Sequence, residues 1–256
     1  IVACMDIADG RVKKGTNFKN LRDAGDPVQL GKLYSDNGID ELIFLDVMAT
    51  VESRDILLDL VKRVAKEINI PFAVGGGIRT LDDIKKLLDA GADKVSIGSM
   101  AVTNPNFVSE AAKEFGSQCI IISVDPKKEV WTCPERAKRV EGWKIYIKGG
   151  REKTDVDAIE FCQNMEKRGA GELLVNSLDR DGTKEGYDVE LLQAIGNATN
   201  LPVIASSGAG KKEDFLEVFE KADTSAALAA SLFHYQELDI KNLKQYLVKN
   251  GINIRL

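Results

Sequence analysis

Two aspartates are the residues of this chain whose placement best suits acid–base chemistry. Asp6 ends the apolar run Val2–Met5, and Asp125 ends the apolar run Ile121–Val124. Two carboxylates that face one substrate can divide the work, because a desolvated carboxyl stays protonated as the acid while the other acts as the base. Each aspartate alone could instead cap the turn that follows it. We predict that the pair is catalytic.

Loops of glycine and other small residues are the candidates for phosphate binding. Backbone N–H groups in such loops can approach an anion closely at the start of a helix. Binding has to be local here, because the formal net charge of −5 repels anions globally. The alternative is that these glycines only form tight turns. The loops are Gly75–Gly77, Gly98–Ser99, Ser206–Gly210 and Ala230–Ser231.

The elements that position these residues follow a regular pattern. Short apolar runs alternate with longer amphipathic stretches along all 256 residues. This alternation predicts parallel βαβ units, and eight units at this length favour a closed barrel over an open sheet. We therefore predict an α/β fold, a single (βα)8 TIM barrel domain over residues 1–256, with its site at the C-terminal ends of the strands. The predicted strands are Ile1–Met5, Leu42–Leu45, Phe72–Val74, Lys94–Ile97, Cys119–Val124, Leu173–Val175, Val203–Ala205 and Ala226–Leu228. The predicted helices include Pro27–Tyr34, Ser53–Ile68, Leu81–Ala90, Pro105–Phe115 and Val156–Arg168.

An internal repeat predicts that the barrel is built from two homologous half-barrels. At an offset of 131 residues, each of three successive βα units in the first half matches a unit in the second half. Strand 1 then corresponds to strand 5, which places Asp6 and Asp125 opposite each other. The matched pairs are Gly38–Ile43 with Gly169–Leu174, Pro71–Ile78 with Pro202–Ala209, Asp83 with Asp214, and Ser96–Ser99 with Ala227–Ala230.

One segment breaks the symmetry of the repeat. Asp6 and Asp125 are 125 − 6 = 119 residues apart, so the segment after strand 5 is longer than its counterpart by 131 − 119 = 12 residues. The extra length falls in Pro126–Gly150, which contains Trp131 and Trp143. We predict that this inserted segment forms a hairpin over the mouth of the barrel.

Other polar residues have two interpretations each. We predict that Asp179–Thr183, after strand 6, faces the substrate, although a solvated turn is the alternative. Lys14 lies on the long first loop, where it could close over a phosphate or remain in solvent. Charges at the bottom of a barrel are usually solvated residues that serve stability, and this is the interpretation that the sequence alone favours for Glu41, Lys94 and Glu172.

Composition excludes several classes of protein. Apolar residues make up 44% and charged residues 29%, and no apolar stretch is long enough to cross a membrane. A pI of about 5.2 argues against a nucleic-acid surface. The four cysteines are scattered and His234 is the only histidine, so we predict no metal site and no cofactor. There is no secretory n-region and h-region, and we expect a cytoplasmic protein with reduced thiols.

With these residues identified, the chain resembles the cyclase subunit of imidazole glycerol phosphate synthase, an enzyme of histidine biosynthesis. The resemblance covers essentially the whole chain. The chain differs from the family at three positions. Ser207 stands where glycine is common, Gly98 where asparagine is frequent, and Asp214 where histidine is usual. The motifs that carry it are Ala3–Asp6, Asp9–Val12, Lys14–Phe18, Leu21–Pro27, Val74–Ile78, Gly91–Ser96, Gly169–Glu172, Asp179–Thr183 and Ala229–His234.

The resemblance implies a reaction and a partner. The family converts a bisphosphate, the phosphoribulosyl-formimino derivative of aminoimidazole carboxamide ribotide, with ammonia into imidazole glycerol phosphate and aminoimidazole carboxamide ribotide. The ammonia comes from a glutaminase subunit docked at the N-terminal face of the barrel and passes through the barrel.

The resemblance also implies roles for individual residues. Asp6 and Asp125 are the general acid and base, and Lys14 lies on a loop that closes on the substrate. The residues implied in binding the substrate and its two phosphates are Gly77, Gly98 and Ser99 on one rim, and Asp181, Gly182, Gly208, Ala230 and Ser231 on the other. The residues implied in the ammonia gate and the glutaminase contact are Glu41, Asp93, Lys94 and Glu172.

Two alternatives remain open on the sequence. The sister isomerase of the same pathway shares the fold, the repeat and a substrate with two phosphates, and Asp6 and Asp125 fit both enzymes. A non-catalytic barrel, engineered or acting only as a partner of the glutaminase, is an alternative from a different class. Turnover of the bisphosphate with ammonia at high pH, without any partner, discriminates between these alternatives and the cyclase.

Overall fold

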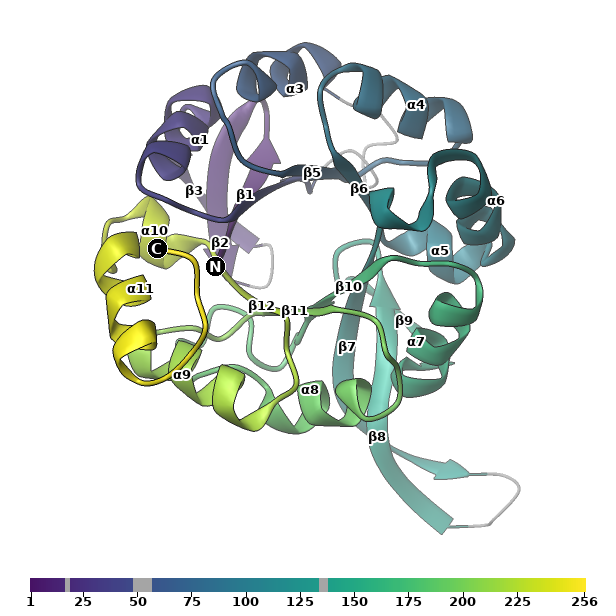
Figure 1. Ribbon diagram of the computed structural model, residues 1–256. Coiled ribbons are helices and arrows are strands. Elements are labelled where there is room, and N and C mark those ends of the chain that lie inside the picture. Colours follow the sequence, from purple (N-terminus) through teal and green to yellow (C-terminus); the bar gives the residue numbers. More distant parts are fainter. Residues whose placement is uncertain (17–18, 48–56, 134–137) are drawn as a thin grey trace.

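The predicted α/β barrel is confirmed. The computed structural model describes residues 1–16, 19–47, 57–133 and 138–256, without the side chains of residues 14–22 and 132–138. In this part of the chain, eight parallel strands close into a ring in the order β10-β11-β12-β1-β4-β5-β6-β7, and β7 pairs with β10 (Figure 1). These strands are β1 (Val2–Ala8), β4 (Glu41–Asp46), β5 (Phe72–Gly75), β6 (Lys94–Ile97), β7 (Ile120–Cys133), β10 (Glu172–Asn176), β11 (Val203–Ser206) and β12 (Ala226–Ala229).

Helices surround the ring on its outside (Figure 1). They form where apolar residues recur at helical spacing behind a capping residue, as at Thr80, whose hydroxyl and the Asp83 carboxylate make a capping box. Of the predicted helix Ser53–Ile68, residues 53–56 lie outside the described part. The helix begins at Leu58, after its N-cap Leu57, and ends at Ala65, three residues before the predicted end. Within that part, no helix is long and apolar enough to cross a membrane. The helices are α1 (Pro27–Asp36), α3 (Leu58–Ala65), α4 (Leu81–Asp89), α5 (Ser99–Thr103), α6 (Asn106–Phe115), η1 (Ser117–Cys119), α7 (Ala158–Lys167), α8 (Val189–Gly196), α9 (Lys212–Lys221), α10 (Ser231–His234) and α11 (Ile240–Lys249).

Side chains alternate between the two faces of each barrel strand. On β1, Ala3, Met5 and Ile7 pack into the large core between strands and helices, whereas Val2 and Cys4 belong to a separate cluster inside the ring. Because successive side chains point to opposite faces, Asp6 shares the inner face with Cys4. On each of the remaining barrel strands, the same alternation determines which polar side chains point into the ring.

The first βα connection is not a loop, as the sequence suggested, but an antiparallel hairpin. Its strands are β2 (Arg11–Thr16) and β3 (Lys19–Gly25), and β2 continues the sheet from β1 by pairing Val12 with Ile7. Lys14 lies on β2, and its side chain is outside the described part. These two strands were not predicted, because their residues are mostly polar and show no alternation of apolar and polar positions.

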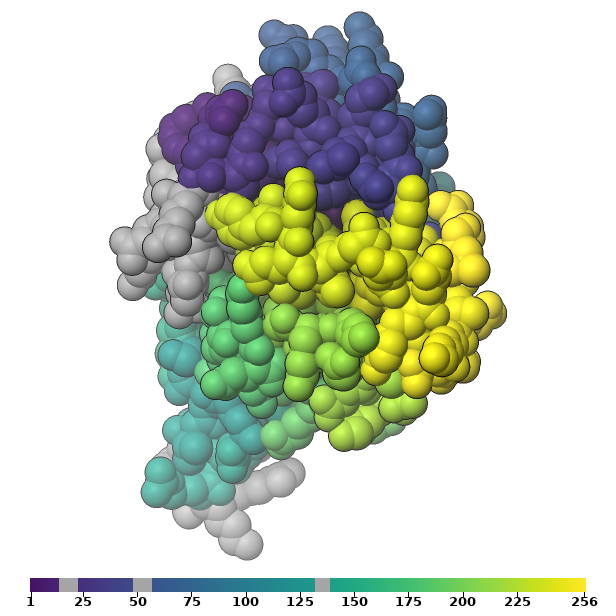
Figure 2. Space-filling view, turned by 90° about the vertical axis from the view of Figure 1, so that its left-hand side faces the viewer, coloured from purple at the N-terminus to yellow at the C-terminus, as the bar shows by residue number. Residues whose placement is uncertain are grey.

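The segment after Asp125 forms a hairpin, but its predicted position over the mouth is wrong. Strand β7 continues without a break to Cys133 and pairs antiparallel with β8 (Lys138–Ile147), which in turn pairs with β9 (Glu152–Asp157). Because β7 runs on in its own direction, the hairpin projects outward beyond the ring of helices (Figures 1 and 2). Among the described residues of the inserted segment, only its end, Ile147–Gly149, lines a cavity at the mouth, and the projecting part of the hairpin does not cover it.

The two halves repeat down to individual hydrogen bonds. The Asp83 carboxylate accepts from the backbone N–H groups of Arg79 at 3.0 Å and Thr80 at 2.9 Å. The Asp214 carboxylate, 131 positions later, accepts from the N–H groups four and three residues before it at 2.7 and 3.0 Å. The helices α3 and α8 also begin and end 131 residues apart.

The last unit of the repeat corrects the predicted match by one residue. Helix α9 has 10 residues where α4 has 9, so the offset beyond it becomes 132. Ser99 and Ser231, which begin α5 and α10, are then equivalent. The predicted match of Ser96–Ser99 with Ala227–Ala230 is wrong, because a shift by one residue would turn each inward side chain of the strand outward.

Candidate active site

The ring places the two candidate catalytic aspartates on opposite strands. Four steps along the hydrogen-bonded order separate β1 from β7 in either direction. Asp6 is 3% exposed, and the Cys4 thiol donates to its Oδ1 at 3.6 Å. Asp125 is partly exposed and lines a cavity at the C-terminal ends of the strands. Both carboxyls thus stand on the inner face of the barrel.

Asp125 has the electrostatic environment of a group that can exchange a proton near neutral pH. Burial raises its pKa, the hydrogen bond from Asn176 lowers it, and the negative charge of Asp181 raises it, to about 6 in total. Asn176 Nδ2 donates to Asp125 Oδ1 at 2.9 Å and to Ser123 Oγ at 3.1 Å. A carboxyl with this pKa holds a proton more readily than an ordinary aspartate and can still release it.

The larger cavity lies beside Asp125 and has a volume of about 300 Å³. It brings together three residues predicted to bind phosphate, Gly77, Gly98 and Ser99, with Asp125 itself. Gly76, the preceding residue, has a φ of +95°, and a Cβ there would stand 2.2 Å from the Asp46 carbonyl oxygen. Glycine is required at this turn for both reasons.

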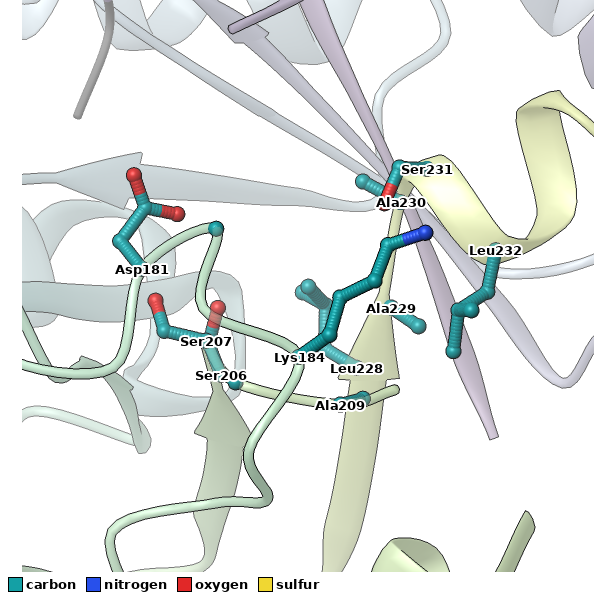
Figure 3. Close-up of a pocket in the computed structure, with 12 residues that line it drawn as sticks. Asp181, Lys184, Ser206, Ser207, Ala209, Leu228, Ala229, Ala230, Ser231 and Leu232 are labelled. Atoms are coloured by element: carbon teal, nitrogen blue, oxygen red, sulfur yellow. The ribbon is translucent and has the colours of Figure 1, made fainter. Parts of the chain in front are cut away.

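A smaller cavity of about 60 Å³ lies between the loops that follow β10, β11 and β12 (Figure 3). The predicted residues of the second rim all line it. Ser207, which replaces the usual glycine, has a φ of 79°, so it adopts the left-handed conformation that glycine has at Gly76. The residues of the second rim in this cavity are Asp181, Gly182, Gly208, Ala230 and Ser231.

The three charged residues at the bottom of the barrel form one cluster rather than three solvated side chains. Lys94 Nζ donates to both carboxylate oxygens of Glu41 at 3.0 and 2.9 Å and to Glu172 at 2.9 Å. Burial disfavours the charge of Lys94, but the two glutamates outweigh it and raise its pKa. Burial also raises the pKa of Glu41, and Lys94 offsets this in part. Nearby, the exposed Asp93 accepts the Phe72 N–H at 2.9 Å.

Several polar residues of the site escaped the sequence analysis. Asn176 touches Asp125, and Arg79 and Lys148 line the larger cavity, while Lys184 lines the smaller one. The signal for Asn176 was present, since it lies four residues after Glu172 on the inner face of the same strand. Lys184 carried no such signal, because it lies in a loop.

A match to a family model identifies the class of protein to which this barrel belongs. This class is the histidine biosynthesis proteins, whose family model matches residues 1–239. The imidazole glycerol phosphate synthase subunit HisF of Hydrogenobaculum sp. (strain Y04AAS1) is 52% identical over 258 residues, covering 100% of this chain and 98% of the relative. The corresponding subunit of Clostridium botulinum (strain Langeland / NCTC 10281 / Type F) is 50% identical over 256 residues, covering 100% of this chain and 98% of the relative. The chain belongs to the HisF family of imidazole glycerol phosphate synthase subunits, and it is an enzyme subunit.

Proposed function

We propose that this chain catalyses the cyclase step of imidazole glycerol phosphate synthesis. It takes the phosphoribulosyl-formimino aminoimidazole carboxamide ribotide and ammonia to imidazole glycerol phosphate and aminoimidazole carboxamide ribotide. The observation that carries the proposal is the pair of inward carboxyls on opposite strands, Asp6 and Asp125, with Asp125 lining one of the two cavities at the C-terminal ends of the strands. Membership of the HisF family supports the same reaction.

The residues divide into two phosphate sites and one reaction centre. Gly77, Gly98 and Ser99 hold one phosphate of the substrate in the larger cavity, and Gly208 and Ser231, with Asp181, Gly182 and Ala230 beside them, hold the other in the smaller cavity. A substrate with a phosphate at each end then lies across the mouth between the two aspartates. Support comes from the equivalence of the two sites in the repeat, where both turns are left-handed and both cavities adjoin a helix that begins with serine.

The chemistry needs two proton transfers. Ammonia attacks the ribulosyl ketone, and an acid protonates the oxygen that departs as water. A base then removes a proton as the new imine nitrogen closes on the formimino carbon and the carboxamide ribotide leaves. The raised pKa of Asp125, about 6, favours it as the acid, which leaves Asp6 as the base. Each transfer contributes on the order of 10²–10⁴ to the rate.

Ammonia enters, in this proposal, at the bottom of the barrel from a glutaminase subunit. Lys94, Glu41 and Glu172 form the entrance, and Asp93 contacts the glutaminase. Ser96 lies two residues above Lys94 on the inner face, and its buried hydroxyl has no hydrogen-bond partner among the described residues. A polar atom there is available to a passing ammonia molecule. Lys14, on β2, closes over the substrate.

The cell compartment proposed for this reaction is the cytoplasm. Among the described cysteine side chains, Cys4, Cys119 and Cys162 take part in no disulfide bond, which suits a reducing compartment. The proposal also favours the cyclase over the sister isomerase, because the isomerase has no use for an ammonia entrance such as the Lys94 cluster.

The test is turnover of the bisphosphate with ammonium salt at high pH, with no partner present. We expect the wild-type chain to form both products, and Asp6→Asn and Asp125→Asn each to lose at least about two orders of magnitude, because amide replacement removes proton transfer but keeps the shape. Circular dichroism should show that both variants are folded. Near-normal kcat in both variants would refute the catalytic assignment, and isomerisation of the phosphoribosyl form of the substrate, with no ammonia present, would point to the sister enzyme.

A further inference from the structure

Lys184 stands at the wall of the smaller cavity. Of the described residues that line this cavity, it is the only one with a cationic side chain. Its side chain runs from the loop after β10 along the cavity, and its Nζ ends on the side of Ala230 and Ser231 (Figure 3). A phosphate bound by Ser231 would lie within the field of this ammonium group.

The backbone of Lys184 is closely packed, whereas its side chain is about half exposed. Its φ of 59° is in the left-handed region, which a lysine adopts only where its surroundings enforce it. The neighbouring loop enforces it here, because a Cβ on Gly210 would stand 2.3 Å from the Lys184 carbonyl oxygen. The lysine is therefore anchored at one end and has four flexible bonds at the other.

The ammonium group is held by Glu237. Lys184 Nζ donates to Glu237 Oε2 at 2.5 Å, with side-chain exposures of 45% and 40%. Glu237 lies three residues beyond the last residue of α10, on a turn closed by the bond from Leu238 N–H to the Leu232 carbonyl at 3.1 Å. An exposed pair of this kind contributes little stability, and water or another anion can replace Glu237 as the partner of the ammonium group.

We propose that Lys184 is an exchangeable phosphate ligand, held by Glu237 in the empty site and transferred to the substrate phosphate when the smaller cavity fills. This rests on the proposed function, in which that cavity takes one of the two phosphates. The exchange swaps one anionic partner for another that carries more charge, so it favours a phosphate dianion over a neutral or singly charged group. It also offsets the negative charge of Asp181, whose carboxyl lines the same cavity.

The exchange predicts opposite effects for the two partners. Lys184→Gln should raise the KM for the bisphosphate by about ten-fold, the scale of one charge-assisted hydrogen bond, with the effect falling mainly on KM. Glu237→Gln should lower KM, because the lysine is then released to the phosphate. A pair that only stabilises the fold would weaken the enzyme in the same direction with either substitution.

A double variant separates the exchange from a general change of field. In a background of Lys184→Gln, Glu237→Gln should have no further effect, because Glu237 acts only through the lysine. Independent field effects would add. The matched control is the exposed pair Lys221 and Glu217, joined at 2.6 Å, where glutamine substitutions should leave KM unchanged. Same-sign effects of the single variants, or an additive double variant, would overturn the proposal.

Titration with inorganic phosphate keeps this test independent of the reaction. Calorimetry should show weaker phosphate binding in Lys184→Gln and tighter binding in Glu237→Gln, whatever substrate the enzyme turns over. Opposite shifts with no turnover of the bisphosphate would refute the proposed function and support the exchange. Normal turnover with phosphate affinity indifferent to both substitutions would overturn the exchange and leave the function intact.

Discussion

Burial raises the pKa of Asp125 and Asn176 opposes that rise, so removing the amide of Asn176 should move the pH profile of the enzyme. The amide donates to Asp125 Oδ1 at 2.9 Å, and this bond lowers a pKa that burial raises. Asn176→Leu keeps the approximate shape of the side chain and removes the donor. The pKa of Asp125 should therefore rise further.

The size of the rise follows from the energy of the bond. A hydrogen bond to a charged group contributes about 1.5–3 kcal/mol, and one pKa unit is about 1.4 kcal/mol, so the loss amounts to about one to two units. The pKa of Asp125 should then move from about 6 to about 7–8. The direction is upward whether Asp125 acts as acid or base, because losing the donor always disfavours the carboxylate.

The assay is the pH profile of ammonia-dependent turnover, with the concentration of unprotonated ammonia held constant at each pH. This correction matters because ammonia itself titrates within the range. The limb assigned to Asp125 should move upward in Asn176→Leu and further in Asn176→Asp, which adds a negative charge beside it. Ser123→Ala is the matched control, because it removes the second partner of the same amide and leaves the bond to Asp125. An unmoved limb in Asn176→Leu, or an equal movement in Ser123→Ala, would refute this reasoning.

Two further predictions concern the same molecule. Asp125→Asn should stabilise the fold at pH 7.5 by up to about 3 kcal/mol, because a pKa raised from 3.8 to about 6 makes the ionised carboxylate unfavourable in the folded state. This gain in stability should shrink as the pH falls from 6 towards 4. An equal gain at pH 4 in thermal melts would contradict the prediction. Lys94→Ala should lower glutamine-dependent synthesis, measured with a matched glutaminase, much more than synthesis from external ammonia, since external ammonia reaches the top face directly. Loss of stability alone would depress both activities together, so an unchanged ratio would identify the Lys94 cluster as structural.

The sequence predicted the barrel because its signal is local. Each barrel strand is a short apolar run, and the run from Ile121 to Val124 was found for the same reason as the others. Side chains alternate between the two faces of a strand, so the sequence alone indicates which residues point inward. Asp6 and Asp125, at the ends of their apolar runs, could therefore be recognised. The two hairpins were not predictable in the same way, because β2 and β3 have no apolar alternation and the direction of β7 beyond Asp125 depends on the geometry of the whole ring.

Contacts between side chains that are far apart in the sequence could not be predicted from it either. Lys94, Glu41 and Glu172 each suggested a solvated residue by itself, and only closure of the ring brings Lys94 Nζ within 3.0 Å of carboxylate oxygens of both glutamates. Lys184 and Glu237 are separated by 53 residues and neither lies in a regular element. No periodicity relates such residues, so their pairing depends on the folded positions of two loops.

The additional residue of α9 shows where this barrel can change in length during evolution. One more residue rotates the exit of a helix by about 100°, which the following loop can absorb, whereas one more residue in a strand turns its inner side chains outward. Two copies of an ancestral half can therefore diverge in length on the outer ring while their inner register stays identical. A symmetric barrel built from one half could accordingly take a helix of 9 or 10 residues at this position, and its strands would still direct the same residues inward.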